Sequence, residues 1–258
     1  MDIHRAATAF DAVAEAYERG RPEYPADAVE VLVDALGIGD TTTVVDVAAG
    51  TGKLTRPLAA TGARVIAVEP VAGMRLVLAD RLPDIEVVEG TAERTGLPAA
   101  VADAVTVGQA FHWFRGAEAL AEFHRLLRPG GALGLVWNRR DLSQPLQAEL
   151  DALLEPYRKD TPSLAGGAWR GAFGPDAPFC SLEEAHVPMT QVLGVEGLVD
   201  RLLSISFVAG LPQPERDGLA SAVGRVASRH GPPLELRYVT DVYWCTARRG
   251  TGGPGHPV

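Results

Sequence analysis

Between residues 41 and 138, short apolar segments alternate with segments that have helical periodicity. The expected strands are residues 42–48, 64–70, 85–90, 103–111 and 132–138. The expected helices between them are residues 53–61, 72–82 and 116–127. Apolar runs this short, set between helices, are typical of strands buried on both faces, as in a parallel sheet with right-handed crossovers. This alternation predicts an α/β fold, a Rossmann-like three-layer sandwich.

The flanking segments follow a different pattern. Two helices are expected before the core, at 6–18 and 26–37, and a helix, a strand, two helices and a last strand after it, at 144–158, 182–193, 195–210, 214–229 and 234–248. The Gly- and Pro-rich stretch 160–179 is expected to be a mobile loop, and the tail 249–258 to be disordered. We predict one domain over 1–248, with lid helices in 1–38, a ligand-binding core in 41–138 and a cover in 139–248.

Composition argues against several classes of partner. Of 258 residues, 47% are hydrophobic, and the net charge of −9 argues against a nucleic-acid partner, which needs clustered Lys and Arg. The two cysteines, Cys180 and Cys245, lack C-x-x-C spacing, so we expect no disulfide, no metal site and a reducing cytoplasm. No signal peptide and no apolar run of roughly 18 residues is seen, so no membrane partner is expected.

The most informative stretch is VVDVAAGTGK, residues 44–53, where a strand is expected to end in a glycine-rich turn. A phosphate loop needs Gly five residues before Gly52, but Val47 is there, and Leu54 replaces the hydroxyl residue that would meet Mg²⁺. A dinucleotide fingerprint needs a third Gly where the chain has Thr55. Both alternatives therefore fit poorly.

Acidic residues near the turn suggest another ligand. Asp46 precedes the Gly50-Thr-Gly52 pair, and Glu69 is expected at the carboxyl edge of the adjacent strand, where a carboxylate accepts both ribose hydroxyls. Residues 89–93 follow the third strand, where a turn can contact an adenine edge. The ligand should carry an adenosine, an ammonium group and no phosphates, which fits S-adenosyl-L-methionine. The alternatives without a ligand are that Asp46 is only a helix cap and that Glu69 is a solvated carboxylate.

At this point the chain resembles the class I S-adenosylmethionine-dependent methyltransferases, through VVDVAAGTG, VIAVEP, GTAE, VGQAFHWF and LLRPGGAL in order. AYERGRPEYP, QAFHWF and RYVTDVYW are similar to the small-molecule branch that includes trans-aconitate methyltransferase-like proteins (methyltransferase type 11). The resemblance implies a seven-stranded sheet whose last strand inserts antiparallel. It also implies a cofactor pocket formed by Tyr17, Arg21, Asp46, Ala48, Gly50, Gly52, Glu69, Pro70, Met74, Thr91, Ala92, Glu93, Gln109, Ala110 and Trp113.

Two features of this pocket need comment. The family usually has Gly at the position of Ala48, and the additional methyl group is expected to be tolerated or to alter the affinity for the cofactor. In the branch, the segment before the sheet closes over the cofactor, and Tyr17 and Arg21 would meet the methionine carboxylate, an anion otherwise unpaired in a dry site. A surface helix with a proline stop is the alternative.

His112 is the candidate general base, because a neutral imidazole could take a phenol or alcohol proton. Its alternative role is a packing or hydrogen-bonding residue of the pocket. The expected acceptor-side residues are Trp137, Asn138, Arg139, Trp169 and Phe173. A surface role for Arg139 is the competing interpretation, and His124 and His186 are read as structural.

The sequence thus predicts a cytoplasmic methyltransferase, monomer or homodimer, that acts on a small organic acceptor and releases S-adenosyl-L-homocysteine. Oxygen, as carboxylate, phenol or hydroxyl, is the expected acceptor atom, and a role in secondary metabolism is compatible with this. A cofactor-fold protein without methyl transfer, such as a cyclase or regulatory binder, and a nucleic-acid or protein methyltransferase stay as alternatives.

Overall fold

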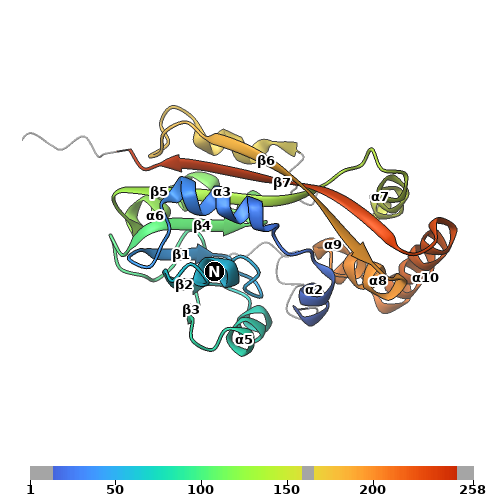
Figure 1. Ribbon diagram of the computed structural model, residues 1–258. Coiled ribbons are helices and arrows are strands. Elements are labelled where there is room, and N and C mark those ends of the chain that lie inside the picture. Colours follow the sequence, from blue (N-terminus) through green and yellow to red (C-terminus); the bar gives the residue numbers. More distant parts are fainter. Residues whose placement is uncertain (1–13, 159–165, 249–258) are drawn as a thin grey trace, which may run out of the picture.

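The computed structural model describes residues 14–158 and 166–248, and in them the chain forms one seven-stranded sheet of order β3-β2-β1-β4-β5-β7-β6 (Figure 1). The strands are β1 Thr43–Val47, β2 Arg64–Val68, β3 Glu86–Val88, β4 Ala102–Gly108, β5 Leu127–Arg140, β6 Glu183–Leu193 and β7 Leu234–Thr246. The first five are parallel, and β7 lies antiparallel between β5 and β6. Both the α/β fold and the antiparallel last strand are confirmed.

Helices cover both faces of the sheet. Successive side chains of a strand point to opposite faces, and every residue of β1 is buried, so both faces of this strand are covered. On one face, α3 (Ala26–Leu36) and α4 (Thr55–Ala59) pack against Val44. On the other, α6 (Gly116–Leu126) packs against Val45. The sheet therefore sits at the centre of the molecule, and its carboxyl edge is left for loops.

The segment after β5 builds a second apolar cluster. It contains α7 (Pro145–Arg158), α8 (Val195–Leu203), α9 (Ser206–Ala209) and α10 (Gln213–His230), which pack against Leu234, Leu236 and Tyr238 of β7. Figure 1 shows α8, α9 and α10 gathered at one end of the long strands β6 and β7, with α2 (Ala14–Gly20) beside them. Within the described ranges, none of the helices is long and apolar enough to cross a membrane.

Three sequence expectations need correction. The single helix expected over 195–210 is broken, because Ile205 is extended and separates α8 from α9. The described part of the expected loop 160–179 contains a 3-10 helix, η4 (Ala168–Phe173), whose aromatic residues pack into the core. β5 begins at Leu127 and not at 132, because Leu127 already pairs with Ala102 before the register shifts. Part of the predicted helix 6–18 and the tail 249–258 lie outside the described residues.

Candidate functional site

The turn after β1 has the unusual backbone that its sequence suggests. Ala48, Gly50 and Gly52 all have positive φ angles, of 54°, 60° and 89°. A Cβ on Gly50 would meet no described atom within 4 Å, so this glycine borders open space. A Cβ on Gly52 would come within 3.0 Å of Leu82, and Gly52 lines neither recess described below. Gly52 therefore allows close packing against α5 (Ala72–Arg81), and its contact with the cofactor stays a prediction.

Glu69 connects the ends of β1 and β2. Its two carboxylate oxygens accept hydrogen bonds from the backbone N–H groups of Gly50, at 2.9 Å, and Val71, at 2.8 Å. Burial raises the pKa of Glu69 to about 7, although these two hydrogen bonds act in the opposite direction. The carboxylate is thus fixed at the carboxyl edge of the sheet and keeps unused acceptor capacity toward a ligand.

Asp46 lies deeper than the sequence suggested. Its side chain is fully buried and accepts hydrogen bonds from the hydroxyl groups of Thr55, at 2.6 Å, and Thr106, at 2.9 Å. Burial raises its pKa to about 6, with the two threonines opposing the shift. Asp46 is therefore neither a solvated residue nor a simple helix cap. An ammonium group would contact it at the bottom of the smaller recess, directly or through a water molecule.

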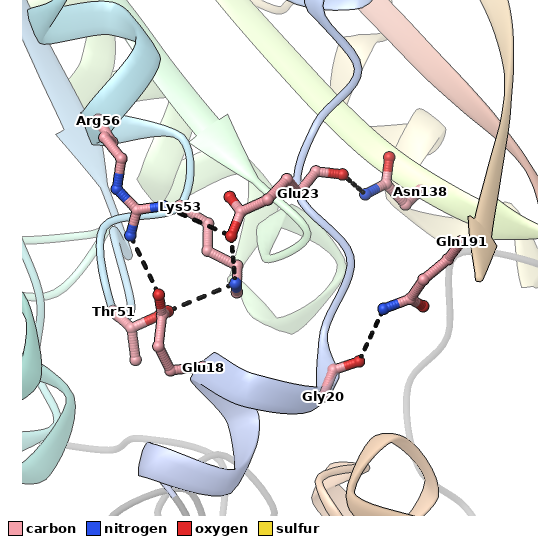
Figure 2. A network of polar contacts seen from close by, with 8 residues as sticks. All are labelled: Glu18, Gly20, Glu23, Thr51, Lys53, Arg56, Asn138 and Gln191. Atoms are coloured by element: carbon pink, nitrogen blue, oxygen red, sulfur yellow. Dashed lines mark hydrogen bonds and ion pairs between the residues drawn. The ribbon is translucent and has the colours of Figure 1, made fainter. Parts of the chain in front are cut away.

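The segment 14–25, here called the strap, crosses the glycine-rich turn and is held there by charge (Figure 2). Lys53 lies 3.5 Å from Glu18 and 2.7 Å from Glu23, and Thr51 donates a 2.6 Å hydrogen bond to Glu18. Arg56 adds a 3.0 Å ion pair with Glu18. Burial raises the pKa of Glu18, but Thr51, Lys53 and Arg56 outweigh it and leave that pKa below its usual value.

Two amides hold the other side of the strap. Asn138 near the end of β5 donates to the carbonyl of Glu23, and Gln191 of β6 donates to the carbonyl of Gly20 (Figure 2). An added Cβ on Gly20 would approach the backbone of Arg201 to 2.7 Å, so the strap also lies directly against α8. The strap therefore closes over the turn from both the core and the cover.

Two recesses meet beneath the strap. The larger, of about 1050 Å³, is bordered by all the predicted pocket residues except Asp46 and Gly52, namely Tyr17, Arg21, Ala48, Gly50, Glu69, Pro70, Met74, Thr91, Ala92, Glu93, Gln109, Ala110 and Trp113, and also by His112. The smaller, of about 520 Å³, shares with it Tyr17, Arg21, Ala48, Gly50, Gly108 and Gln109. Asp46, Asn138 and Arg201 line only the smaller one.

Two guanidinium groups border these recesses without an ion-pair partner among the described residues. Arg21 donates to the carbonyl of Ser204, which the break between α8 and α9 leaves free, while its Nε lacks an acceptor. Arg201 donates from Nε to the Tyr238 hydroxyl, while its buried Nη1 lacks an acceptor. Burial, and next the charge of Arg201, lowers the pKa of Arg21 to about 10. Such a site favours an anion.

His112 borders the larger recess in the 3-10 helix η2 (Phe111–Trp113). Burial and then the charge of Arg21 lower its pKa to about 4, so the ring is neutral near pH 7. The Trp137 Nε1–H donates to His112 Nδ1 at 3.4 Å. Because indole is only a donor, this contact assigns the ring hydrogen to Nε2 and makes His112 a hydrogen-bond donor toward other partners.

The predicted acceptor-side residues divide by position. Asn138 borders the smaller recess, whereas Trp137 is buried and its ring centroid lies 4.8 Å from that of Trp169. Trp169 and Phe173 pack in the core with Phe111, although Trp169 also borders a separate surface recess. Arg139 lines none of the recesses described here and forms a 2.9 Å ion pair with Asp241, so its contact with the acceptor stays a prediction.

Several residues of this region were missed from the sequence. Arg201 and Gln191 come from the cover, far along the chain from the turn, and no local motif marks them. Tyr24 could have been found, because AYERGRPEYP was already recognised, and it borders the smaller recess against Gly108. Glu18, Thr51 and Lys53 also belong to motifs that were quoted, but their mutual contacts depend on the fold of the strap.

Comparison with known proteins identifies the family of this chain. The model of a methyltransferase domain family matches residues 45–135. An uncharacterised methyltransferase of Mycobacterium tuberculosis is 36% identical over 236 residues, which are 90% of this chain and 92% of that protein. A methyltransferase-like protein of Schizosaccharomyces pombe is 35% identical over 212 residues, 82% of each chain.

Solved structures show the same fold. A proposed type II methyltransferase from Anaeromyxobacter dehalogenans superimposes with a TM-score of 0.63 at 25% identity, and the match covers 88% of this chain and 97% of that one. The fold and the relatives together define a methyltransferase. The chain belongs to the class I S-adenosylmethionine-dependent methyltransferases, as the sequence resemblance implied.

Proposed function

We propose that this protein transfers a methyl group from S-adenosyl-L-methionine to an oxygen atom of a small organic acceptor. The observation that carries the proposal is the larger recess, in which the Glu69 carboxylate is fixed by the Gly50 N–H beside an open glycine. A carboxylate at the carboxyl edge of an α/β sheet, next to a close-approach glycine, suits a ribose diol.

The residues present fit this cofactor. Glu69 would accept the ribose hydroxyls, and Thr91, Ala92 and Glu93 would border the adenine. The unpartnered Nε of Arg21 would receive the methionine carboxylate. When bound, the cofactor supplies a methyl group on a positively charged sulfur, which leaves as a neutral thioether with the bonding electron pair. A phosphate beside Glu69 would be repelled by its carboxylate, which disfavours a nucleotide in the ribose part of the larger recess.

The acceptor would lie where the two recesses meet, between Asn138, which lines the smaller recess near the end of β5, and His112, which lines the larger one. Methyl transfer needs alignment and exclusion of water more than acid–base chemistry, since the leaving group is already activated. The strap supplies both by closing over the recesses. With its hydrogen on Nε2, His112 orients the acceptor by donating a hydrogen bond, and this replaces the base role as our interpretation.

Calorimetry tests the proposal directly. Wild-type protein is titrated with S-adenosylmethionine, S-adenosylhomocysteine and, as a phosphate-bearing control, NAD. Binding of the first two and not the third is expected, and Glu69→Ala should weaken both. Absence of binding at near-millimolar concentration would defeat the assignment. Binding without methylation of any compound in a broad oxygen-acceptor panel would favour a protein that keeps the cofactor fold without methyl transfer.

A further inference from the structure

We propose that Arg201 binds a carboxylate of the methyl acceptor, so that the acceptor is a small organic acid; this rests on the proposed function above. Arg201 belongs to α8, in the cover, and borders only the smaller recess. The residue is only 5% exposed, and its Nη1 has no hydrogen-bond partner within the described residues. A buried guanidinium N–H without an acceptor is costly, and a carboxylate is the acceptor it fits best.

The other charges around Arg201 are already matched. Arg140, which lies near enough to affect it, pairs with Asp151 at 2.6 Å. Lys53, which also borders the smaller recess, pairs with Glu18 and Glu23 of the strap. Tyr238 and Gln191 supply only neutral groups on the remaining side. In the described part of the chain, Arg21 and Arg201 are thus the cations of this recess that keep an unmatched charge.

The cofactor can match only one of the two arginines. It carries one carboxylate, one ammonium and one sulfonium group. Arg21 borders both recesses and can take the carboxylate, while Asp46 balances the ammonium. Arg201 and the sulfonium then remain as two uncompensated positive charges in a buried site. A monoanionic acceptor group offsets one of these two charges and supplies the acceptor that Arg201 Nη1 lacks, whereas a phosphate would need more donors than this one.

The experiment uses the full chain saturated with S-adenosylhomocysteine and titrated with benzoate, cinnamate and hexanoate, each beside its primary amide, and with inorganic phosphate. We expect at least one carboxylate to bind about tenfold more tightly than its amide and than phosphate. This preference should vanish in Arg201→Gln and shrink in Arg201→Lys. It should persist in Arg216→Gln, the matched control, because the Arg216 Nε is also buried without a partner but lines neither recess.

The outcomes separate this inference from the proposed function. If the wild type binds S-adenosylhomocysteine but prefers no carboxylate to its amide, or prefers phosphate, the inference is overturned and the proposed function stands. If Arg201→Gln loses S-adenosylhomocysteine binding as fully as Arg21→Gln does, Arg201 belongs to the cofactor site, and the inference again fails. If the wild type does not bind S-adenosylhomocysteine at all, the proposed function and the inference fail together.

Discussion

The ammonium group of Lys53 lies 2.7 Å from a carboxylate oxygen of Glu23, so the lysine that follows the glycine-rich turn binds the chain's own strap. A lysine in this sequence position is reminiscent of a phosphate loop, in which it would reach a nucleotide. Here the same side chain is 9% exposed and also contacts Glu18. The strap and the turn therefore form one electrostatic unit around the ligand recesses.

Replacing this lysine should loosen the strap. Lys53→Met leaves Glu18 buried with only Arg56 and Thr51 as partners, and we expect a loss of about 2 kcal/mol in the free energy of unfolding. Urea denaturation measures this. Arg64→Met, which breaks an exposed ion pair with Glu86, is the control and should cost less than about 0.5 kcal/mol. Equal effects of the two substitutions would contradict a structural role for the Lys53 network.

Glu69 should make cofactor affinity depend on pH. Its pKa is about 7 in the free protein, and ribose hydroxyls donate better to the ionised carboxylate, so binding favours loss of the proton. Affinity should therefore rise between pH 6 and pH 8 and level off above pH 8. Below the pKa of Glu69, the rise should be at most about tenfold per pH unit. Calorimetry with S-adenosylhomocysteine checks the slope.

Glu69→Gln is the matched variant, because it keeps the size and removes the charge. Affinity should fall by roughly 10-fold to 100-fold at pH 8, the cost of a charge-assisted hydrogen bond, and the pH dependence over this interval should flatten. A variant with the wild-type slope would show that another group titrates. The sign for folding is opposite: a raised carboxyl pKa stabilises the unliganded protein below about pH 4.5, and this contribution is lost as pH rises toward 7.

Features that depend on residues close together in the sequence could be predicted, whereas contacts between residues far apart in the sequence could not. The strands and the positions of Gly50 and Glu69 follow from local periodicity and from the rule that parallel strands share a carboxyl edge. Arg201 and Gln191 could not be predicted, because nothing local tells which cover side chain meets the strap. The ion pair of Arg139 with Asp241 could not be predicted either, because an arginine near a strand end can point to either face and its partner lies on β7, far along the chain.

Ala48 should be replaceable by the glycine that is usual in the family. Its φ of 54° is left-handed, which costs an L-residue about 1 kcal/mol or more, while glycine adds about 0.5 kcal/mol or more of chain entropy to lose. Ala48→Gly should therefore leave stability unchanged or raise it by up to about 1 kcal/mol. Thermal unfolding measures this change.

Ala100→Gly is the control for Ala48, because Ala100 is exposed, has a φ of 50° and lines neither recess. It should change stability in the same way but leave S-adenosylhomocysteine affinity untouched. A shift of affinity in Ala48→Gly alone would show that the methyl group of Ala48 contacts the ligand. If Ala48→Gly instead lowers stability by about 1 kcal/mol, as the same substitution does inside a helix, the left-handed backbone of Ala48 is not strained.

Two substitutions of His112 distinguish a hydrogen-bond donor from a general base. Gln places an amide N–H near the position of Nε2 but cannot act as a base, whereas Ala removes both functions. If His112 donates, His112→Gln should keep turnover within about tenfold of the wild type, and His112→Ala should lose at least another tenfold. The kcat–pH profile should also lack an inflection near 6.5, because burial lowers the His112 pKa to about 4. Equal inactivity of both variants, together with an inflection in the wild type that both abolish, would restore the base role and overturn the tautomer assigned from the Trp137 contact.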